Sequence, residues 1–166
     1  MQSFRVIKPT AALVPYVRHY WVLSDDALAP VSERTLPVGC VQMVFHRGRQ
    51  LFSLTEGRLQ PSSFISGQAF GYSDVESTGM LEMIVVVFQP FAAKAFLHMP
   101  ISEFRGMNVN TEETGDPLLV DLGRRIADMP DRVACIRLIE EFLLSRLYAF
   151  PEYNLKRVST VLEAVN

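Results

Sequence analysis

The sequence predicts an α+β protein, in which short strands precede a helical hairpin and one further short helix. Aromatic and β-branched residues fill several segments of the first half, and the strongest of these spans residues 80–88. After Pro90 the apolar residues recur at helical spacing, first over residues 117–129 and then over residues 132–150. Residues 154–166 carry a separate amphipathic helical pattern.

Composition restricts the class of protein. The chain has 166 residues, 49% of them hydrophobic, which suffices for one domain with a core. Its formal net charge is -2, so we do not expect this chain alone to bind nucleic acid. Cys40 and Cys135 have no metal-ligand spacing, which is typical of reduced, buried thiols. Without a signal peptide or a membrane-length apolar run, we expect a cytoplasmic protein with no membrane partner.

Short strands alternate with turns at the start of the chain. Residues 3–8 and 18–24 have strand composition, and residues 24–30 form a polar loop. Residues 10–17 predict a brief helical or turn segment, because Pro15 prevents a long helix there.

A strong strand is predicted at residues 40–47, with alternate side chains on opposite faces. One face holds Val41, Met43 and Phe45, and the other holds Cys40, Gln42, Val44 and His46. Residues 50–54 follow a turn and are expected to return as the hairpin partner of this strand.

Two apolar strands follow, separated by a turn. Residues 63–66 predict a short strand, and residues 71–78 are polar and turn-like. Residues 80–88 are apolar on both faces apart from Glu82. We therefore expect a second sheet to cover one side of this strand and helices to cover the other.

The helical part begins with a predicted short helix at residues 91–99. Asp116 and Pro117 then form a good helix start, and the two longer helices follow as a hairpin. The apolar stripe of the longer helix is wide. One face of it is expected to pack on the sheet, and the remaining width indicates a partner helix from a second copy. The dimer-interface prediction comprises Leu118, Leu122, Ile126, Ile136, Ile139, Leu143 and Leu147.

No motif in the sequence indicates catalysis. His19, His46 and His98 lie in separate elements without metal-ligand spacing, and His46 is expected to be solvated or hydrogen-bonded at a strand edge. Nucleophile elbows and glycine-rich phosphate loops are also missing from the sequence. We therefore expect no catalytic residues, no metal and no cofactor.

Two residues have alternative interpretations. Glu82 either faces solvent at the sheet edge or is a buried carboxylate that orients a polar ligand, and we favour the first. Trp21 either lines a pocket between sheets or fills the core, and a core role is the safer prediction.

Several segments, taken in order, resemble one group of arabinose-regulator-type (AraC-type) transcription factors. The matching segments are Tyr16-Val17-Arg18-His19-Tyr20-Trp21, Leu36-Pro37-Val38-Gly39-Cys40 with Val44-Phe45, Phe64-Ile65-Ser66-Gly67, Phe88-Gln89-Pro90-Phe91-Ala92 and Ile101-Ser102-Glu103-Phe104. The sequence departs from the group's pattern at Val38, where an acidic residue is frequent, and at Ala92-Ala93, where glycines are frequent.

The resemblance implies a cupin-like β-sandwich or barrel, followed by a helical pair used for dimerisation. It divides the chain into a sensor and dimerisation domain at residues 1–150, and a hinge with a truncated extra helix at residues 151–166. In such regulators this helix would open a helix-turn-helix region, which alone would bind DNA.

The resulting hypothesis is the effector-binding or dimerisation domain of a bacterial transcription factor, forming a homodimer through its C-terminal helices. A small-molecule effector would bind inside the sandwich. The predicted ligand-binding residues are Trp21, Gln42, Met43, Phe45, Glu82 and Met83. Two rival interpretations are a stand-alone small-molecule-binding barrel, including a cryptic enzyme, and a structural dimerisation module with a filled core.

Overall fold

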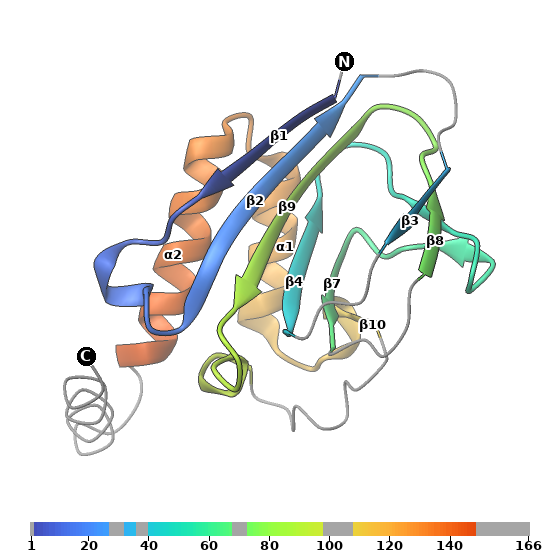
Figure 1. The fold of residues 1–166 in the computed structure, drawn as a ribbon. Helices are drawn as coiled ribbons and strands as arrows, with labels where there is room; N and C mark the ends of the chain where they lie inside the picture. The colour runs from blue at the N-terminus through green and yellow to red at the C-terminus, as the bar shows by residue number, and fades with distance from the viewer. Residues whose placement is uncertain (1, 27–31, 36–39, 68–72, 98–107, 149–166) are drawn as a thin grey trace.

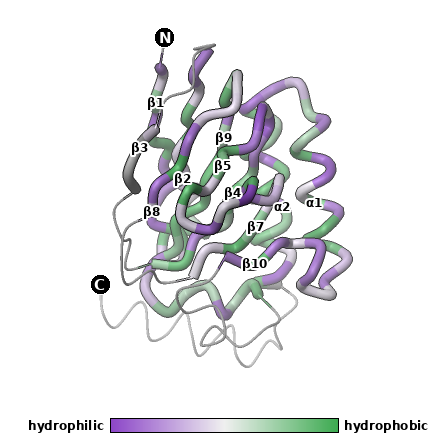
Figure 2. Tube along the Cα trace, turned by 90° about the vertical axis from the view of Figure 1, so that its right-hand side faces the viewer, coloured by the Kyte–Doolittle hydropathy of each residue, from purple (hydrophilic) through white to green (hydrophobic). Residues whose placement is uncertain are grey.

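The protein is built in three layers around one central sheet. The computed structural model describes residues 2–26, 32–35, 40–67, 73–97 and 108–148. Two helices cover one face of the central sheet, and a smaller sheet covers part of the other face (Figure 1). Figure 2 shows the same layers from the side, with the helices and the smaller sheet on opposite sides of the central strands. The structure is therefore α+β, as the sequence predicts.

Six antiparallel strands form the central sheet in the order β1-β2-β9-β4-β7-β10. Their bounds are Gln2–Ile7 for β1, Val17–Asp25 for β2, Leu81–Phe88 for β9, Gln42–His46 for β4, Ser63–Ser66 for β7 and Asn108–Asn110 for β10. Five of the six strands expected from the sequence lie in this sheet, the exception being residues 50–54, and β10 extends the sheet at one edge.

The smaller sheet has the order β3-β8-β5-β6. Its strands span Ser32–Thr35 for β3, Ser73–Glu76 for β8, Phe52–Ser53 for β5 and Arg58–Leu59 for β6. The hairpin prediction for residues 50–54 is wrong, because β5 pairs with β6 and β8 while β4 pairs with β7 and β9. The turn prediction for residues 71–78 is also wrong. Val75 is the one buried residue of β8, so this strand lacks an apolar pattern.

Two helices, α1 (Pro117–Asp128) and α2 (Arg132–Tyr148), follow the sheets. The predicted start of α1 is confirmed: the Asp116 side chain caps the helix by accepting from the Leu119 amide, and proline occupies the first turn. No helix among the described residues is long and apolar enough to cross a membrane. The predicted helix at residues 154–166, like the hinge before it, lies outside the described residues.

Three short 3-10 turns complete the described elements: η1 (Ala11–Leu13), η2 (Ala93–Ala95) and η4 (Thr111–Glu113). Within the described part of residues 91–99, η2 replaces the predicted helix. Phe91 explains why the helix does not begin there, because its φ of 66° is left-handed.

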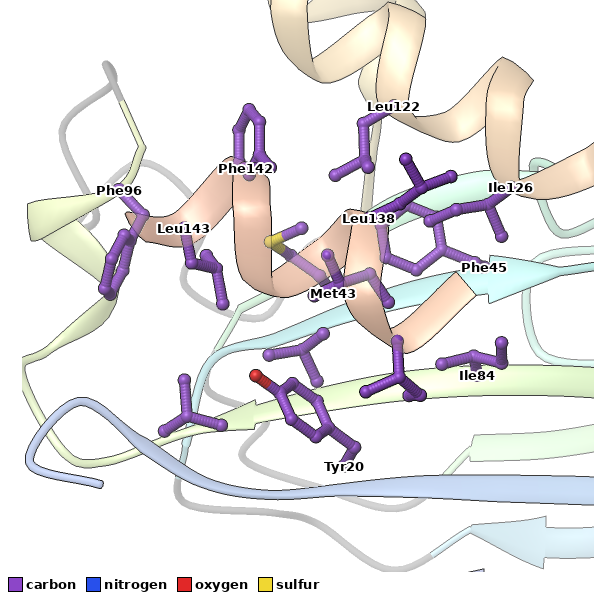
Figure 3. Close-up of a cluster of buried hydrophobic side chains, with 14 of the residues drawn as sticks. Tyr20, Met43, Phe45, Ile84, Phe96, Leu122, Ile126, Leu138, Phe142 and Leu143 are labelled. Carbon is purple, nitrogen blue, oxygen red and sulfur yellow. The ribbon is translucent and has the colours of Figure 1, made fainter. Parts of the chain in front are cut away.

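The apolar core has two parts, one on each face of β9. Ile84, Val86 and Phe88 pack beneath the helices, whereas Met83 and Val85 face the smaller sheet. This confirms the prediction that both faces of residues 80–88 are covered. Figure 3 shows the part beneath the helices, where Met43 and Phe45 of β4 point toward α1 and α2.

The wide apolar stripe of the helices is used inside the chain. Its buried members pack in the core shared with the sheet and η1: Leu122, Ile126, Ile136, Ile139, Leu143 and Leu147. By contrast, Leu118 on α1 is 62% exposed. The width of the stripe arises because α2 contacts the sheet, α1 and η1 at once.

Phe91 gives a testable stability effect. Its left-handed backbone costs a non-glycine residue about 1 kcal/mol, and its ring is 89% exposed. We expect Phe91→Gly to raise the free energy of unfolding by up to about 1 kcal/mol in chemical denaturation, because the strain relieved exceeds the entropy that glycine adds to the unfolded chain. Ala92→Gly is the matched control, since Ala92 has right-handed helical angles and should lose stability. A destabilised Phe91→Gly would contradict this account.

Candidate functional site

The candidate site is the layer of side chains between the two sheets, which we call the inter-sheet layer. It forms because alternate residues of β2, β9 and β4 point away from the helices. Its buried members are Cys40, Val44, Leu51, Phe64, Val75, Leu81, Met83, Val85 and Val87, with Trp21 and Leu23 partly buried beside them. Such a layer can bind an apolar ligand or simply form a filled core. Polar side chains in the layer that lack a partner would favour a ligand site.

His46 is the polar side chain that distinguishes this layer. It is 3% exposed, and its Nε2 lies 3.0 Å from Gln60 Oε1. Its Nδ1 is buried and has no hydrogen-bond partner among the described residues. Burial lowers the pKa of His46 below its ordinary value of 6.5, although the Gln60 hydrogen bond opposes this shift. A buried, half-satisfied imidazole is an unusual feature that calls for a partner.

The sheet register connects His46 with the exposed edge of the layer. On the face toward the smaller sheet, His46 lies opposite Met83, Met83 opposite Leu23, and Leu23 opposite Phe4. The exposed fraction changes along this row from 60% at Phe4 to 6% at Met83 and 3% at His46. Phe4 also contacts the Trp21 ring, with centroids 5.7 Å apart. The smaller sheet therefore covers the β4 end of the row and leaves the β1 end open.

The opposite face of the same two strands holds the helices in place. Arg47, which follows His46, donates to the carboxylate of Glu82, which precedes Met83, and to the backbone carbonyl of Met129. Arg47 Nε also donates to the Ile126 carbonyl at 3.3 Å. A cation suits this position, because the carbonyls at a helix C-terminus carry partial negative charge.

Glu82 extends this contact to α2. Its Oε1 accepts from Nε of Arg132, in the first turn of α2, at 2.8 Å. We call residues 126–132, where α1 ends and α2 begins, the helix corner. Arg47 is 8% exposed and Glu82 25% exposed, so the ion pair is largely shielded from water. Strands β4 and β9 thus carry the inter-sheet layer on one face and the helix corner on the other.

Two further polar contacts hold the helices to the body of the protein. The Asp116 carboxylate accepts two hydrogen bonds from Arg146 of α2, at 2.6 and 2.7 Å. The Tyr20 hydroxyl donates to Glu140 at 3.1 Å, and the pKa of Tyr20 rises because of burial and the adjacent carboxylate. These contacts are structural, since each joins α2 to a neighbouring element and is shielded from solvent.

The six predicted ligand-binding residues divide evenly between the two faces of the sheet. Trp21, Gln42 and Met83 are on strand positions that face the inter-sheet layer. Met43, Phe45 and Glu82 lie on the helix side, where the first two are buried in the core and Glu82 binds the two arginines. The structure therefore brings together only the first three around one layer.

His46 is the site residue that the sequence does not identify as functional. Its predicted place at a strand edge is wrong, because β4 lies inside the sheet between β9 and β7. The available signal is a single histidine in a strand that is apolar apart from Gln42, on the face shared with Val44. The described residues contain no group of three or more potential metal ligands, and His98 lies outside them.

Protonation of His46 should make stability depend on pH. Because the pKa of His46 is lower in the folded state, the unfolded chain takes up this proton at a higher pH than the folded protein does. The free energy of unfolding should therefore be constant above about pH 6.5 and fall as the pH drops below it. Urea titrations at several pH values should show a smaller fall for His46→Gln.

His19 is the control for this measurement. Its pKa is also lowered, by burial and then by Arg18, so His19→Gln reports a second contribution in the same direction. Equal pH slopes for the wild type and His46→Gln would contradict the assignment to His46.

Comparisons with known proteins give a match to one family model and likenesses to solved structures. A family model described as a domain of unknown function (DUF6597) matches residues 5–110. This chain belongs to the DUF6597 family. The matched region runs from β1 to β10 and stops before α1, so the family model covers the two sheets and not the two helices. The comparison with curated proteins finds no match.

Among solved structures, this DUF6597 protein is similar to a crystal structure titled as CoII HppE in complex with Tris buffer. The identity is 10% and the TM-score 0.39, over 52% of this chain and 53% of that one. The chain thus spans about half the length of that structure.

Proposed function

We propose that this DUF6597 protein is the regulatory domain of a DNA-binding transcription factor, and that it binds a small-molecule effector between its two sheets. The inter-sheet layer would be the interior of a cupin-like sandwich. The AraC-type segments in the sequence support this proposal, as does the arrangement of two sheets followed by a helical pair. In this role the protein is cytoplasmic, is not an enzyme and binds DNA only through a further helix-turn-helix region.

One structural relation carries the proposal. His46 and Met83 face the inter-sheet layer, and their chain neighbours Arg47 and Glu82 bind the helix corner. A ligand that displaces these strands would act on the Arg47 and Glu82 contacts through a single peptide unit. A regulator needs this kind of link between its ligand site and its partner-binding elements.

Homodimerisation is part of the proposal. The apolar sides of α1 and α2 are covered by their own sheet, so a dimer through these helices has to use their outward residues. Leu118 and Val133 are the large apolar side chains exposed there, at 62% and 59%. Sedimentation equilibrium should show a dimer that Leu118→Asp together with Val133→Asp weakens. A monomer at all concentrations would remove this part of the proposal.

The test of the function compares two chain lengths. Residues 1–166 and the chain extended to the natural end of its reading frame are tested in gel shifts with DNA from upstream of the gene. We expect sequence-specific binding by the extended chain and none by residues 1–166. Specific binding by residues 1–166 alone would contradict the proposal. A reading frame that stops directly after Asn166 would favour the stand-alone binding protein instead.

A further inference from the structure

Resting on the proposed function, we propose that the effector is a small, neutral, apolar molecule with one hydrogen-bond donor, such as a phenol, and that it donates this hydrogen bond to His46 Nδ1. The observations that support this are the unpartnered ring nitrogen, the row of side chains that joins His46 to the exposed Phe4, and the apolar character of that row.

The protonation state of His46 fixes the polarity of the ligand group. Gln60 Oε1 accepts from Nε2, so Nε2 carries the ring proton and Nδ1 has a free lone pair. The lowered pKa keeps this ring neutral near pH 7. The complementary ligand group is therefore a hydroxyl or N–H that donates, and not a carbonyl or carboxylate.

The side chains along the row determine the polarity and charge of the rest of the ligand. Phe4, Leu23 and Met83 are apolar, and their neighbours Trp21 and Val85 on the same face are apolar too. A charged ligand would lose its hydration in this layer without a compensating partner, so a neutral one is favoured. Neighbouring strands lie about 4.8 Å apart, which makes the row from β1 to β4 about 14 Å long.

The β1 end of the row is its exposed end, so a ligand would enter from there. Phe4 and Val6 are 60% and 57% exposed, and Trp21 and Leu23 are only partly buried, because the smaller sheet does not extend over this part of the layer. Met83 lies between this open end and His46. Its unbranched thioether side chain is the type that repacks most readily around a bound molecule.

The test uses phenol as the probe and toluene as the matched molecule without a hydroxyl. With 15N-labelled histidine in residues 1–166, the Nδ1 resonance of His46 should move saturably as phenol is added, while that of His19 should not. Toluene should leave the His46 resonance in place. No movement with phenol, or equal movement with toluene, would overturn the inference.

Two variants separate binding at His46 from binding elsewhere. His46→Leu should weaken phenol binding at least about tenfold in calorimetry, equivalent to about 1.4 kcal/mol, whereas His19→Leu should bind as the wild type does. Unchanged affinity in His46→Leu would also overturn the inference.

If phenol leaves His46 unaffected but a metabolite stabilises the protein, this inference fails and the proposed function stands. If phenol binds at His46 but the extended chain does not bind DNA, the proposed function fails and the inference stands.

Discussion

Replacing Asp116 by alanine should lower the free energy of unfolding by about 3–5 kcal/mol, the largest single effect that we expect. The substitution takes a doubly hydrogen-bonded carboxylate away from the buried Arg146 guanidinium, whose side chain is 4% exposed. It also removes the cap of α1, where Asp116 accepts from the Leu119 amide. Urea denaturation followed by circular dichroism measures the loss.

The control is a second carboxylate–arginine pair, which joins η4 to α1. Glu112 accepts hydrogen bonds from Arg124 through both carboxylate oxygens, but these side chains are 53% and 68% exposed. We expect Glu112→Ala to cost less than about 1 kcal/mol, because water screens an exposed ion pair. If the two variants lose similar stability, burial does not determine the strength of the Asp116–Arg146 pair.

Arg47→Met should cost about 3 kcal/mol, the second-largest effect, and should loosen the helix corner in particular. Methionine keeps much of the buried side-chain volume but donates no hydrogen bonds. The carbonyls of Ile126 and Met129 and the carboxylate of Glu82 would all lose the guanidinium. Relative to the wild type, hydrogen exchange in Arg47→Met should accelerate more at residues 126–132 than in the earlier part of α1.

Arg49→Met is the matched control, because it is the same substitution two residues further along on an exposed side chain. Its effect should stay within about 0.5 kcal/mol. A stable Arg47→Met protein with unchanged exchange at the helix corner would show that this arginine does not hold the helices.

Local chemistry explains which elements the sequence predicts correctly. Asp116 and Pro117 begin α1 because capping and a fixed proline φ act within a few residues. The apolar run in β9 predicts a strand covered on both faces, since both sets of alternate residues are apolar. These signals do not require knowledge of distant parts of the chain.

The smaller sheet and the site depend on contacts that local patterns do not contain. β5 and β6 have two residues each, too few for a period, and β8 has one buried residue, Val75. Arg47 binds Glu82 and Met129, which lie 35 and 82 residues further along the chain. Likewise, the half-satisfied state of His46 is visible only once Gln60 and the smaller sheet are in place.

The regulatory proposal depends on β4 and β9 linking the inter-sheet layer to the helix corner. Met83 and Val75 are both buried in this layer. Met83 is on β9 of the central sheet, which contacts the helices, whereas Val75 is on β8 of the smaller sheet on the far side of the layer. Replacing either by alanine removes apolar volume from the layer and lowers global stability. The two variants therefore perturb the same layer from opposite sides.

Hydrogen exchange at residues 126–132, measured in Met83→Ala and Val75→Ala under conditions of equal global stability, tests this link most directly. We expect faster exchange at the helix corner in Met83→Ala than in Val75→Ala, because the Glu82 contact is one residue from the site of change. Equal exchange at the helix corner in the two variants would contradict it.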